Sequence, residues 1–421
     1  MGMTAVEKMF AAKSGAAAAR AGDIVSARFD RALLNDASGP IALTQLRAMG
    51  AIRLPDTERI VLVGDHFAPP KDVAAADGLR ALKFFARDHG IRHHYGVGDG
   101  GIEHTLMPER GLVRPGDLIV GGDSHTCTAG AFGAFGIGMG STDIAAAMAM
   151  GSLWFTVPET IVVQLRGERK PFVTGKDLIL AVLRELSVDG AAYCCLEFTG
   201  PAIATLNMDE RMALCNMAAE AGAKTCVVPV DAVTDAWSMA IHGTTFPSVT
   251  SDPDAVLHSV LRIDVADVQP LCAHPYSPDN VYSVEDSLGV KVDQVYIGNC
   301  ANGTLTDLRQ AASVLAGRKV ADGVRCIIVP ATQRIFRTAL QEGLIDALVA
   351  AGAVISPSTC GACAGLHMGV MTDGEVTIAT TNRNYRGRMG SPGSRVYLAN
   401  AWVAASAAVV GEIARPMAPL R

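Results

Sequence analysis

The feature of this chain that most constrains its fold is a set of short, continuously apolar segments that each end in glycine and polar residues. Residues 59–63 (RIVLV) lead into Asp65-His66, and residues 118–121 (LIVG) lead into Asp123-Ser124-His125. Apolar runs without alternation are typical of parallel strands that are buried on both faces. Parallel sheets carry their chemistry beyond the carboxyl ends of the strands. The sequence therefore predicts an α/β fold with polar side chains gathered at strand ends.

The length and composition of the chain predict several such units. The chain has 421 residues, more than one hydrophobic core usually supports. Apolar residues make up 49% and charged residues 19%, so core material is ample and disorder is not expected. Residues 231–273 contain polar turns around Pro247 and Pro253 and are expected to be the main linker. We therefore expect three α/β domains, at residues 1–158, 159–270 and 271–421.

Hydrophobic periodicity and turn residues place the individual elements. Helices are expected at residues 43–50, 73–89, 144–155, 175–186, 208–221, 306–316, 334–351 and 396–410. Strands are expected at residues 23–30, 59–63, 118–121, 160–166, 191–199, 225–229, 292–297, 353–355 and 376–381. The most apolar segment, residues 396–410, is shorter than the roughly 20 residues that cross a bilayer and is predicted to be a buried helix.

Cysteine usage and charge indicate the setting of the protein. Ten irregularly spaced cysteines in a chain of this length do not form a disulfide scaffold, which favours a reducing, cytoplasmic compartment. The first twenty residues lack the apolar core of a secretory signal, and Glu7 favours an ordinary first helix over a transit peptide. A net charge of −6 without a long basic run argues against a nucleic-acid or membrane surface.

Three cysteines stand at predicted strand ends among glycines. Cys300 follows the strand predicted at 292–297, and Cys360 and Cys363 form a Cys-x-x-Cys pair after the strand predicted at 353–355. By itself the pair fits a metal site, a redox site or buried apolar thiols equally well. Three thiolates are one ligand short of a closed tetrahedral site, and an open metal position suits Lewis-acid chemistry on a bound oxygen. The other candidates (Cys215, Cys226, Cys272 and Cys326) are expected to be buried apolar side chains.

Acid–base groups occur at three predicted loops. Asp65-His66 and Asp123-Ser124-His125 each follow a strand, and His104 follows Glu103 in a glycine-rich loop. A nearby carboxylate fixes the tautomer of a histidine and raises its basicity, so these histidines are expected to be catalytic. Six other histidines (His89, His93, His94, His242, His258 and His367) are expected to be structural or on the surface.

Two arginines lie on one loop further along the chain. Arg383 and Arg388 are five residues apart, among glycines and beside Asn382. A guanidinium presents paired donors that match a carboxylate. The loop is predicted to bind an anionic substrate next to the cysteines.

Taken in order, these motifs resemble those of the aconitase superfamily, and within it the isopropylmalate isomerase and homoaconitase large-subunit group. The matching stretches are Asp65-His66, GIEH, GGDSHTCTAGAFGAFGIGMGSTD, LEF around Glu197, GNCANG, TCGAC and NRNYRGRMGSPGSRVYL. They cover nearly the whole chain. The resemblance implies three aconitase-type α/β domains around a central cluster-binding cleft, without the fourth, swivelling domain.

The resemblance also implies a cofactor and a reaction. A four-iron, four-sulfur cluster would be held by Cys300, Cys360 and Cys363, with one open, oxidation-prone iron. The reaction would be a reversible dehydration and rehydration of a 2-hydroxy dicarboxylic acid, foremost the conversion of 2-isopropylmalate to 3-isopropylmalate in leucine biosynthesis. Maleate, citraconate (2-methylmalate), dimethylmalate and homoaconitate are the alternative substrates.

Residue roles follow from the same resemblance. Asp65 and His66 would protonate the departing hydroxyl, Asp123 and His125 would hold the iron-bound water, and His104 would pair with Glu197. Ser124, Asn382, Arg383 and Arg388 would bind the substrate.

The family pattern also implies a partner. The swivelling domain supplies a serine base and another substrate arginine in the family, so a separate small subunit is expected to bring them. The loop Asn299–Thr304 departs from the usual GSCTNG-type sequence at Asn299, Ala301 and Thr304, which leaves the exact substrate open.

Overall fold

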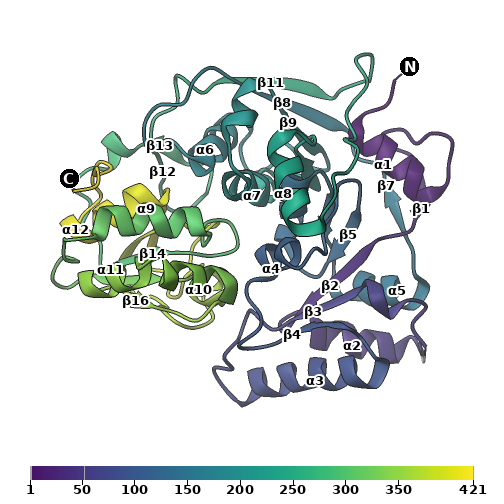
Figure 1. Cartoon of the computed structure of the whole chain (residues 1–421), viewed down its shortest axis with the longest axis horizontal. Helices are drawn as coiled ribbons and strands as arrows, with labels where there is room; N and C mark the ends of the chain where they lie inside the picture. Colours follow the sequence, from purple (N-terminus) through teal and green to yellow (C-terminus); the bar gives the residue numbers. More distant parts are fainter. Residues whose placement is uncertain (1, 52, 421) are drawn as a thin grey trace.

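The first part of the chain is built on a five-stranded parallel sheet. The computed structural model describes residues 2–51 and 53–420. In the order of the sheet, the strands are β4 (His93–Tyr95), β3 (Ile60–Val63), β2 (Arg31–Asn35), β5 (Leu118–Gly121) and β6 (Phe135–Gly138). The helices α2 (Gly39–Ala48), α3 (Val73–His89) and α5 (Ser141–Met150) pack together beside it (Figure 1). The loops after β3 and β5 carry the predicted aspartates and histidines.

A second parallel sheet of four strands follows. Its order is β10 (Thr225–Val227), β9 (Cys195–Thr199), β8 (Thr160–Arg166) and β11 (Ser259–Asp264). Three helices belong to this part of the chain, namely α6 (Gly175–Leu186), α7 (Met208–Asn216) and α8 (Ala232–His242). The strands β1 (Ile24–Ala27) and β7 (Leu153–Thr156), far apart in the chain, form an antiparallel pair next to α1 (Ala5–Ser14).

The third sheet has seven strands and is parallel at its centre. Its order is β13 (Val281–Ser283), β12 (Leu271–Ala273), β18 (Arg395–Leu398), β17 (Val376–Ala379), β14 (Gln294–Ile297), β15 (Arg325–Ile328) and β16 (Val354–Ile355). The accompanying helices are α9 (Leu305–Leu315), α10 (Gln333–Gln341), α11 (Leu344–Ala351) and α12 (Ala401–Val410).

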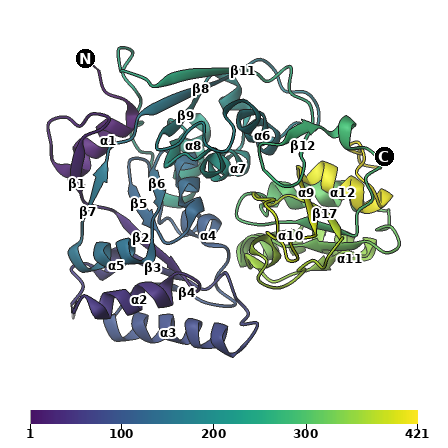
Figure 2. The same cartoon turned by 180° about the vertical axis from the view of Figure 1, so that it is seen from behind.

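The third unit lies against the first at the segment that precedes α4 (Glu103–Glu109). The Ile102 amide donates a hydrogen bond to the Ala331 carbonyl oxygen over 2.7 Å. In both views α4 faces the unit that contains α10 (Figures 1 and 2). Since the three large sheets occupy consecutive parts of the chain, we propose that the domain boundaries fall near residues 158 and 270.

Three of the predicted helices and the predicted linker differ from the structure for local reasons. The helix predicted at 144–155 stops at Met150, because Gly151 adopts a left-handed φ of 74° and β7 follows. The helix predicted at 334–351 is divided by Gly343, which also has a positive φ of 74°. The apolar segment 396–410 is a strand and then a helix, whose N-cap is the Asn400 side chain. Residues 231–273 are not only a linker, since they contain α8 and β11.

Two sequence predictions concern the cysteines and the membrane. All ten cysteines are free thiols, and Cys215, Cys226, Cys272 and Cys326 are buried, which confirms their assignment to the core. Across residues 2–51 and 53–420, no helix combines the length and the apolar character needed to cross a membrane.

Candidate functional site

Three cysteines from two loops of the third sheet line a single cavity. Cys300 lies between β14 and α9, and Cys360 and Cys363 follow β16 around a short 3-10 turn, Gly361–Ala364. The cavity has a volume of about 230 Å³. Gly298 has a φ of 124°, and a Cβ there would collide with the Val329 carbonyl group, so the close approach of these loop ends requires glycine.

Amide groups contact two of the three sulfurs. The Asn382 Nδ2 lies 3.3 Å from Cys300 Sγ, and the Cys363 thiol lies 3.3 Å from the Asn382 Oδ1. Asn216 places its Nδ2 3.2 Å from Cys300 Sγ. A hydrogen bond with Cys360, together with the charges of Arg388 and His125, lowers the pKa of the Cys363 thiol to about 5 despite burial.

This donor set fits the cluster that the sequence resemblance implies. Thiolates from two loops, with N–H donors directed at the sulfurs and one side open to a cavity, are the ligation that iron–sulfur clusters use. The same cavity is lined by the predicted catalytic groups (Asp65, His66, His104, Asp123 and His125) and by the predicted substrate-binding groups Asn382, Arg383 and Arg388. Loops of the first and the third sheet thus meet at one place.

The first acid–base pair, Asp65 and His66, is positioned by the carboxylate of Asp36, which the sequence did not indicate. His66 Nδ1 lies 2.7 Å from Asp65 Oδ1. The backbone amides of Asp65, His66 and Phe67 donate to the buried Asp36 carboxylate over 2.8 to 2.9 Å. This leaves His66 Nε2 on the side of Asp123, at 3.6 Å from Asp123 Oδ2.

Asp123 connects the histidines. His104 Nε2 lies 2.7 Å from Asp123 Oδ1, and the His125 backbone amide donates to the same oxygen over 2.8 Å. His125 Nε2 in turn lies 2.9 Å from Glu220 Oε1. The arrangement is a chain of alternating imidazoles and carboxylates rather than three separate pairs.

The expected pairing of His104 with Glu197 is wrong. Glu197 accepts a hydrogen bond from the Ser251 hydroxyl over 2.5 Å, whereas His104 contacts Asp123. Glu197 lies inside β9, and Ser251 also accepts from the Ala5 amide, so this glutamate anchors the segment that covers the N-terminus. Its motif therefore marks a structural contact of the second sheet and not a group of the cavity.

The charges of this network determine its protonation. Burial opposes ionisation, yet hydrogen bonds from His104, His125 and His66 hold the pKa of Asp123 well below its usual value. Burial also disfavours the imidazolium forms, but the carboxylates outweigh it: Asp65 and Asp123 raise the pKa of His66 well above its usual value, and Asp123 and Glu220 raise that of His125 to about 9. Both histidines are therefore proton donors at neutral pH.

The two predicted arginines differ in their partners. Arg383 Nε donates to Glu220 Oε1 over 2.7 Å, and its Nη2 donates to the Ser124 hydroxyl over 2.9 Å. The buried Arg388 Nε has no hydrogen-bond acceptor among residues 2–51 and 53–420. A guanidinium that lines a cavity with an unpaired donor is suited to an anionic ligand.

The sequence reasoning did not identify Glu220, Lys176, Asn216 or Asp36. For two of them the sequence carried a signal, namely a charge that opposes the helix dipole. Glu220 lies in an alanine-rich segment at a helix end, and Lys176 lies at the start of α6. Lys176 is fully buried and donates to the Thr380 and Thr381 carbonyl oxygens over 3.0 and 2.5 Å. These carbonyls directly precede Asn382 and Arg383.

The His125–Glu220 contact predicts a pH dependence of stability. Since the folded pKa of His125 is about 9 and its ordinary value 6.5, its stabilising contribution is complete below pH 6.5 and is lost as the pH rises through 9. Glu220→Gln is expected to lower the thermal midpoint most near pH 6.5, with a difference from the unmodified protein that narrows by pH 9. A difference that stays constant over this range would show that the pair is not ionic.

Comparison with known proteins links this geometry to a family. The model of the aconitase family (aconitate hydratase) matches residues 7–411. The chain is 51% identical over 413 residues to the 3-isopropylmalate dehydratase large subunit 2 of Rubrobacter xylanophilus, covering 98% of this chain and 97% of that protein. It is 49% identical over 416 residues to the 3-isopropylmalate dehydratase large subunit of Heliobacterium modesticaldum, covering 99% of both chains. A large subunit from Moorella thermoacetica matches equally well.

A solved structure supports the fold. The holo-form of aconitase X from Thermococcus kodakaraensis superimposes with a TM-score of 0.51, covering 90% of this chain and 89% of that one at 15% identity. At this identity the likeness concerns the fold alone, and it confirms the predicted aconitase-type α/β architecture.

Proposed function

Because this chain belongs to the aconitase family, we propose that it is the large subunit of a hydro-lyase that converts 2-isopropylmalate to 3-isopropylmalate in leucine biosynthesis. The observation that carries the proposal is the single cavity in which three thiols, a carboxylate–imidazole chain and two guanidiniums meet. The relatives named for this activity match the chain over almost their whole length at about 50% identity, which supports the same substrate.

Cys300, Cys360 and Cys363 are the proposed ligands of a four-iron, four-sulfur cluster. When bound, the cluster supplies a Lewis acid for the substrate hydroxyl and its neighbouring carboxylate. The amide groups of Asn382 and Asn216, 3.2 to 3.3 Å from Cys300 Sγ, are placed to donate to the coordinating sulfur. A thiolate site that is open to a cavity is sensitive to oxidation, so anaerobic handling preserves it.

The acid–base work falls to the histidines. Dehydration removes a hydroxyl from C2 and a proton from C3, and rehydration returns them to the opposite carbons. We assign the proton for the departing hydroxyl to the His66 imidazolium, whose Nδ1 is fixed by Asp65. Asp123, with His104 and His125 around it, is placed to hold the released water. The base that takes the C3 proton is assigned to a small subunit.

The substrate carboxylates have cationic partners on one loop. Arg388 has an unpaired buried Nε in the described part of the chain, and Arg383 is oriented by Glu220 and Ser124. Asn382 lies between these arginines and the thiols, within hydrogen-bond distance of both Cys300 and Cys363. We therefore assign one carboxylate to Arg388 and the second to Arg383, with Ser124 and Asn382 as polar neighbours.

An apolar wall favours isopropylmalate over the alternative substrates. Besides its polar groups, the cavity is lined by Phe67, Ile102 and Leu366. Maleate and homoaconitate offer no branched alkyl group to such a wall, while citraconate and dimethylmalate offer only methyl groups. Burial of an isopropyl group against these side chains gains free energy in proportion to the apolar area removed from water.

A substrate panel tests the assignment. The chain is co-expressed with a candidate small subunit, reconstituted anaerobically with iron and sulfide, and assayed with isopropylmalate, 2-methylmalate, dimethylmalate, maleate and homoaconitate. We expect the highest kcat/KM for isopropylmalate. In Leu366→Ala, the ratio of kcat/KM for isopropylmalate to that for 2-methylmalate is expected to be about tenfold smaller than in the unmodified enzyme. Leu340→Ala, on the exposed side of α10, serves as the matched control. Turnover of another substrate without isopropylmalate, or tight zinc without iron uptake, would contradict the assignment.

The partner and the compartment complete the proposal. The large-subunit names of the relatives support a separate small subunit, which binds over the cavity and brings the missing base. The ten free thiols support a reducing, cytoplasmic location.

A further inference from the structure

A second group of side chains that are common metal ligands lies at the amino ends of strands in the second sheet. Glu159, Cys194 and His258 each directly precede a strand of the second sheet, namely β8, β9 and β11. These strands are adjacent and parallel, with β8 in the middle, so their amino ends lie side by side. The Cys195 amide donates to the Glu159 carbonyl oxygen over 2.8 Å, and the His258 amide donates to that of Thr160 over 2.9 Å. The backbone frame of the group is therefore rigid.

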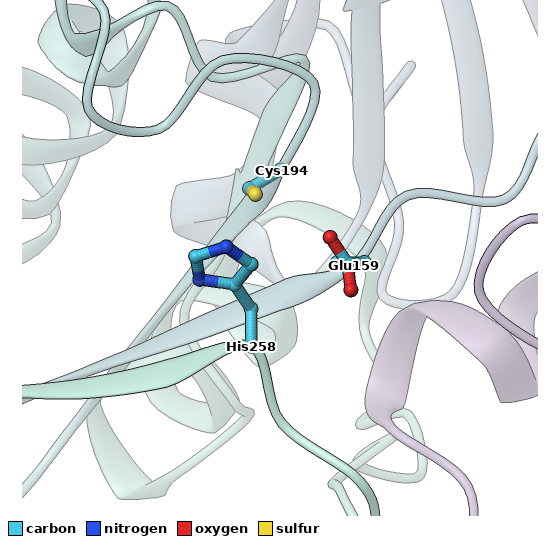
Figure 3. Close-up of side chains that lie close together, drawn as sticks. All are labelled: Glu159, Cys194 and His258. Atoms are coloured by element: carbon cyan, nitrogen blue, oxygen red, sulfur yellow. The ribbon is translucent and has the colours of Figure 1, made fainter.

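The three side chains converge on one point (Figure 3). A carboxylate oxygen of Glu159, the Cys194 Sγ and an imidazole nitrogen of His258 all lie within 4.8 Å of one another. Cys194 is 4% exposed, whereas Glu159 and His258 are exposed. The group thus has a sulfur at its base and two flexible ligands at its rim, which can rotate toward a bound ion.

We propose that Glu159, Cys194 and His258 form a binding site for a divalent cation of the zinc class. Zn²⁺ takes thiolate, imidazole and carboxylate ligands at about 2.0–2.3 Å, and three protein ligands leave a fourth position for water. Mg²⁺ and Ca²⁺ prefer oxygen ligands alone, so the sulfur and nitrogen select against them. The Ser259 hydroxyl lies 3.3 Å from His258 Nδ1, which leaves Nε2 as the nitrogen for the metal.

The local backbone agrees with this assignment. Tyr193, directly before Cys194, has a φ of 62°, a conformation that non-glycine residues seldom adopt and that directs the Cys194 side chain.

The site is separate from the catalytic cavity. None of its three residues lines the cavity of Cys300, Cys360 and Cys363. The site links the amino ends of three strands, whereas the catalytic groups lie on loops that follow the carboxyl ends of strands. A bound ion would crosslink the second sheet and stabilise the native state by mass action, so its role is structural.

The test measures metal binding on cluster-loaded protein, with iron determined in parallel so that the three cavity thiols are known to be occupied. Zn²⁺ is titrated against a chromophoric chelator, and Co²⁺ is used as a spectroscopic probe. We expect one tight Zn²⁺ per chain and a sulfur-to-cobalt charge-transfer band. Cys194→Ser is expected to remove the band. His258→Ala and Glu159→Gln are expected to weaken Zn²⁺ binding by more than the roughly 10–100-fold that loss of an outer partner causes.

His89→Ala is the matched control, since His89 is a partly exposed histidine on α3 that is outside the group. The proposal is overturned by the absence of a saturable Zn²⁺ site. It is equally overturned if the cobalt band persists in Cys194→Ser, or if His258→Ala and Glu159→Gln bind as tightly as His89→Ala. Since these readouts do not involve turnover, they are independent of the substrate proposed above.

Discussion

Replacing Asp123 with asparagine is expected to lower the kcat of the reconstituted two-subunit enzyme by about 10³-fold, within the range that loss of a positioned acid–base group causes. Asp123 contacts His104 at 2.7 Å and the His125 amide at 2.8 Å, and lies 3.6 Å from His66 Nε2. Asparagine keeps the shape but removes the charge that favours the imidazolium forms. The proton donors of the cavity would then be deprotonated at a lower pH.

The pH profile distinguishes this mechanism from simple misfolding. The alkaline limb of kcat is expected to move to lower pH in Asp123→Asn, because the pKa values of His66 and His125 depend on this carboxylate. Asp143→Asn is the matched control, since Asp143 is exposed in the first turn of α5. A variant with normal iron content, normal thermal stability and unchanged kcat would refute the role of Asp123.

Replacing Lys176 with methionine is expected to lower the free energy of unfolding by about 3 kcal/mol. The Lys176 ammonium is fully buried and its hydrogen bonds end at the Thr380 and Thr381 carbonyl oxygens. Charged hydrogen bonds of this kind contribute about 1.5–3 kcal/mol each, and their loss leaves buried carbonyls without a partner. Burial disfavours the charged form of Lys176 and lowers its pKa to about 8. The hydrogen bonds to the two carbonyl oxygens offset this cost in the native state.

The same substitution has a second expected effect. Thr381 precedes Asn382 and Arg383. Loss of the hydrogen bond to the Thr381 carbonyl oxygen is therefore expected to displace these two side chains from their positions beside the thiols. Lys176→Met is expected to raise KM and to lose iron faster on dilution, in addition to its lower thermal midpoint. The matched control is Lys170→Met, because Lys170 is exposed. Equal midpoints and equal iron retention in the two variants would exclude the proposed role.

Much of the fold follows from local patterns in the chain. The strands after which Asp65 and Asp123 stand, and the helices Val73–His89 and Gly175–Leu186, occur where hydrophobic periodicity places them. The errors occur where one residue interrupts a periodic segment. Gly151 and Gly343 end helices through positive φ angles, and the apolar run 396–410 changes from strand to helix. Apolar content alone does not distinguish a buried strand from a buried helix.

The sequence by itself determined the types of chemistry, since strand-end thiols, histidines beside carboxylates and a pair of arginines identify their functional classes by residue type and spacing. Only the tertiary structure decided the partners. It paired His104 with Asp123 instead of Glu197, joined His125 and Arg383 through Glu220, and placed Lys176 against the segment that leads into Asn382. It also brought Glu159, Cys194 and His258 together. The reason is physical: a hydrogen bond needs groups to meet within about 3 Å. Which strand ends meet depends on the order of strands in a sheet, and that order is a property of the packed whole.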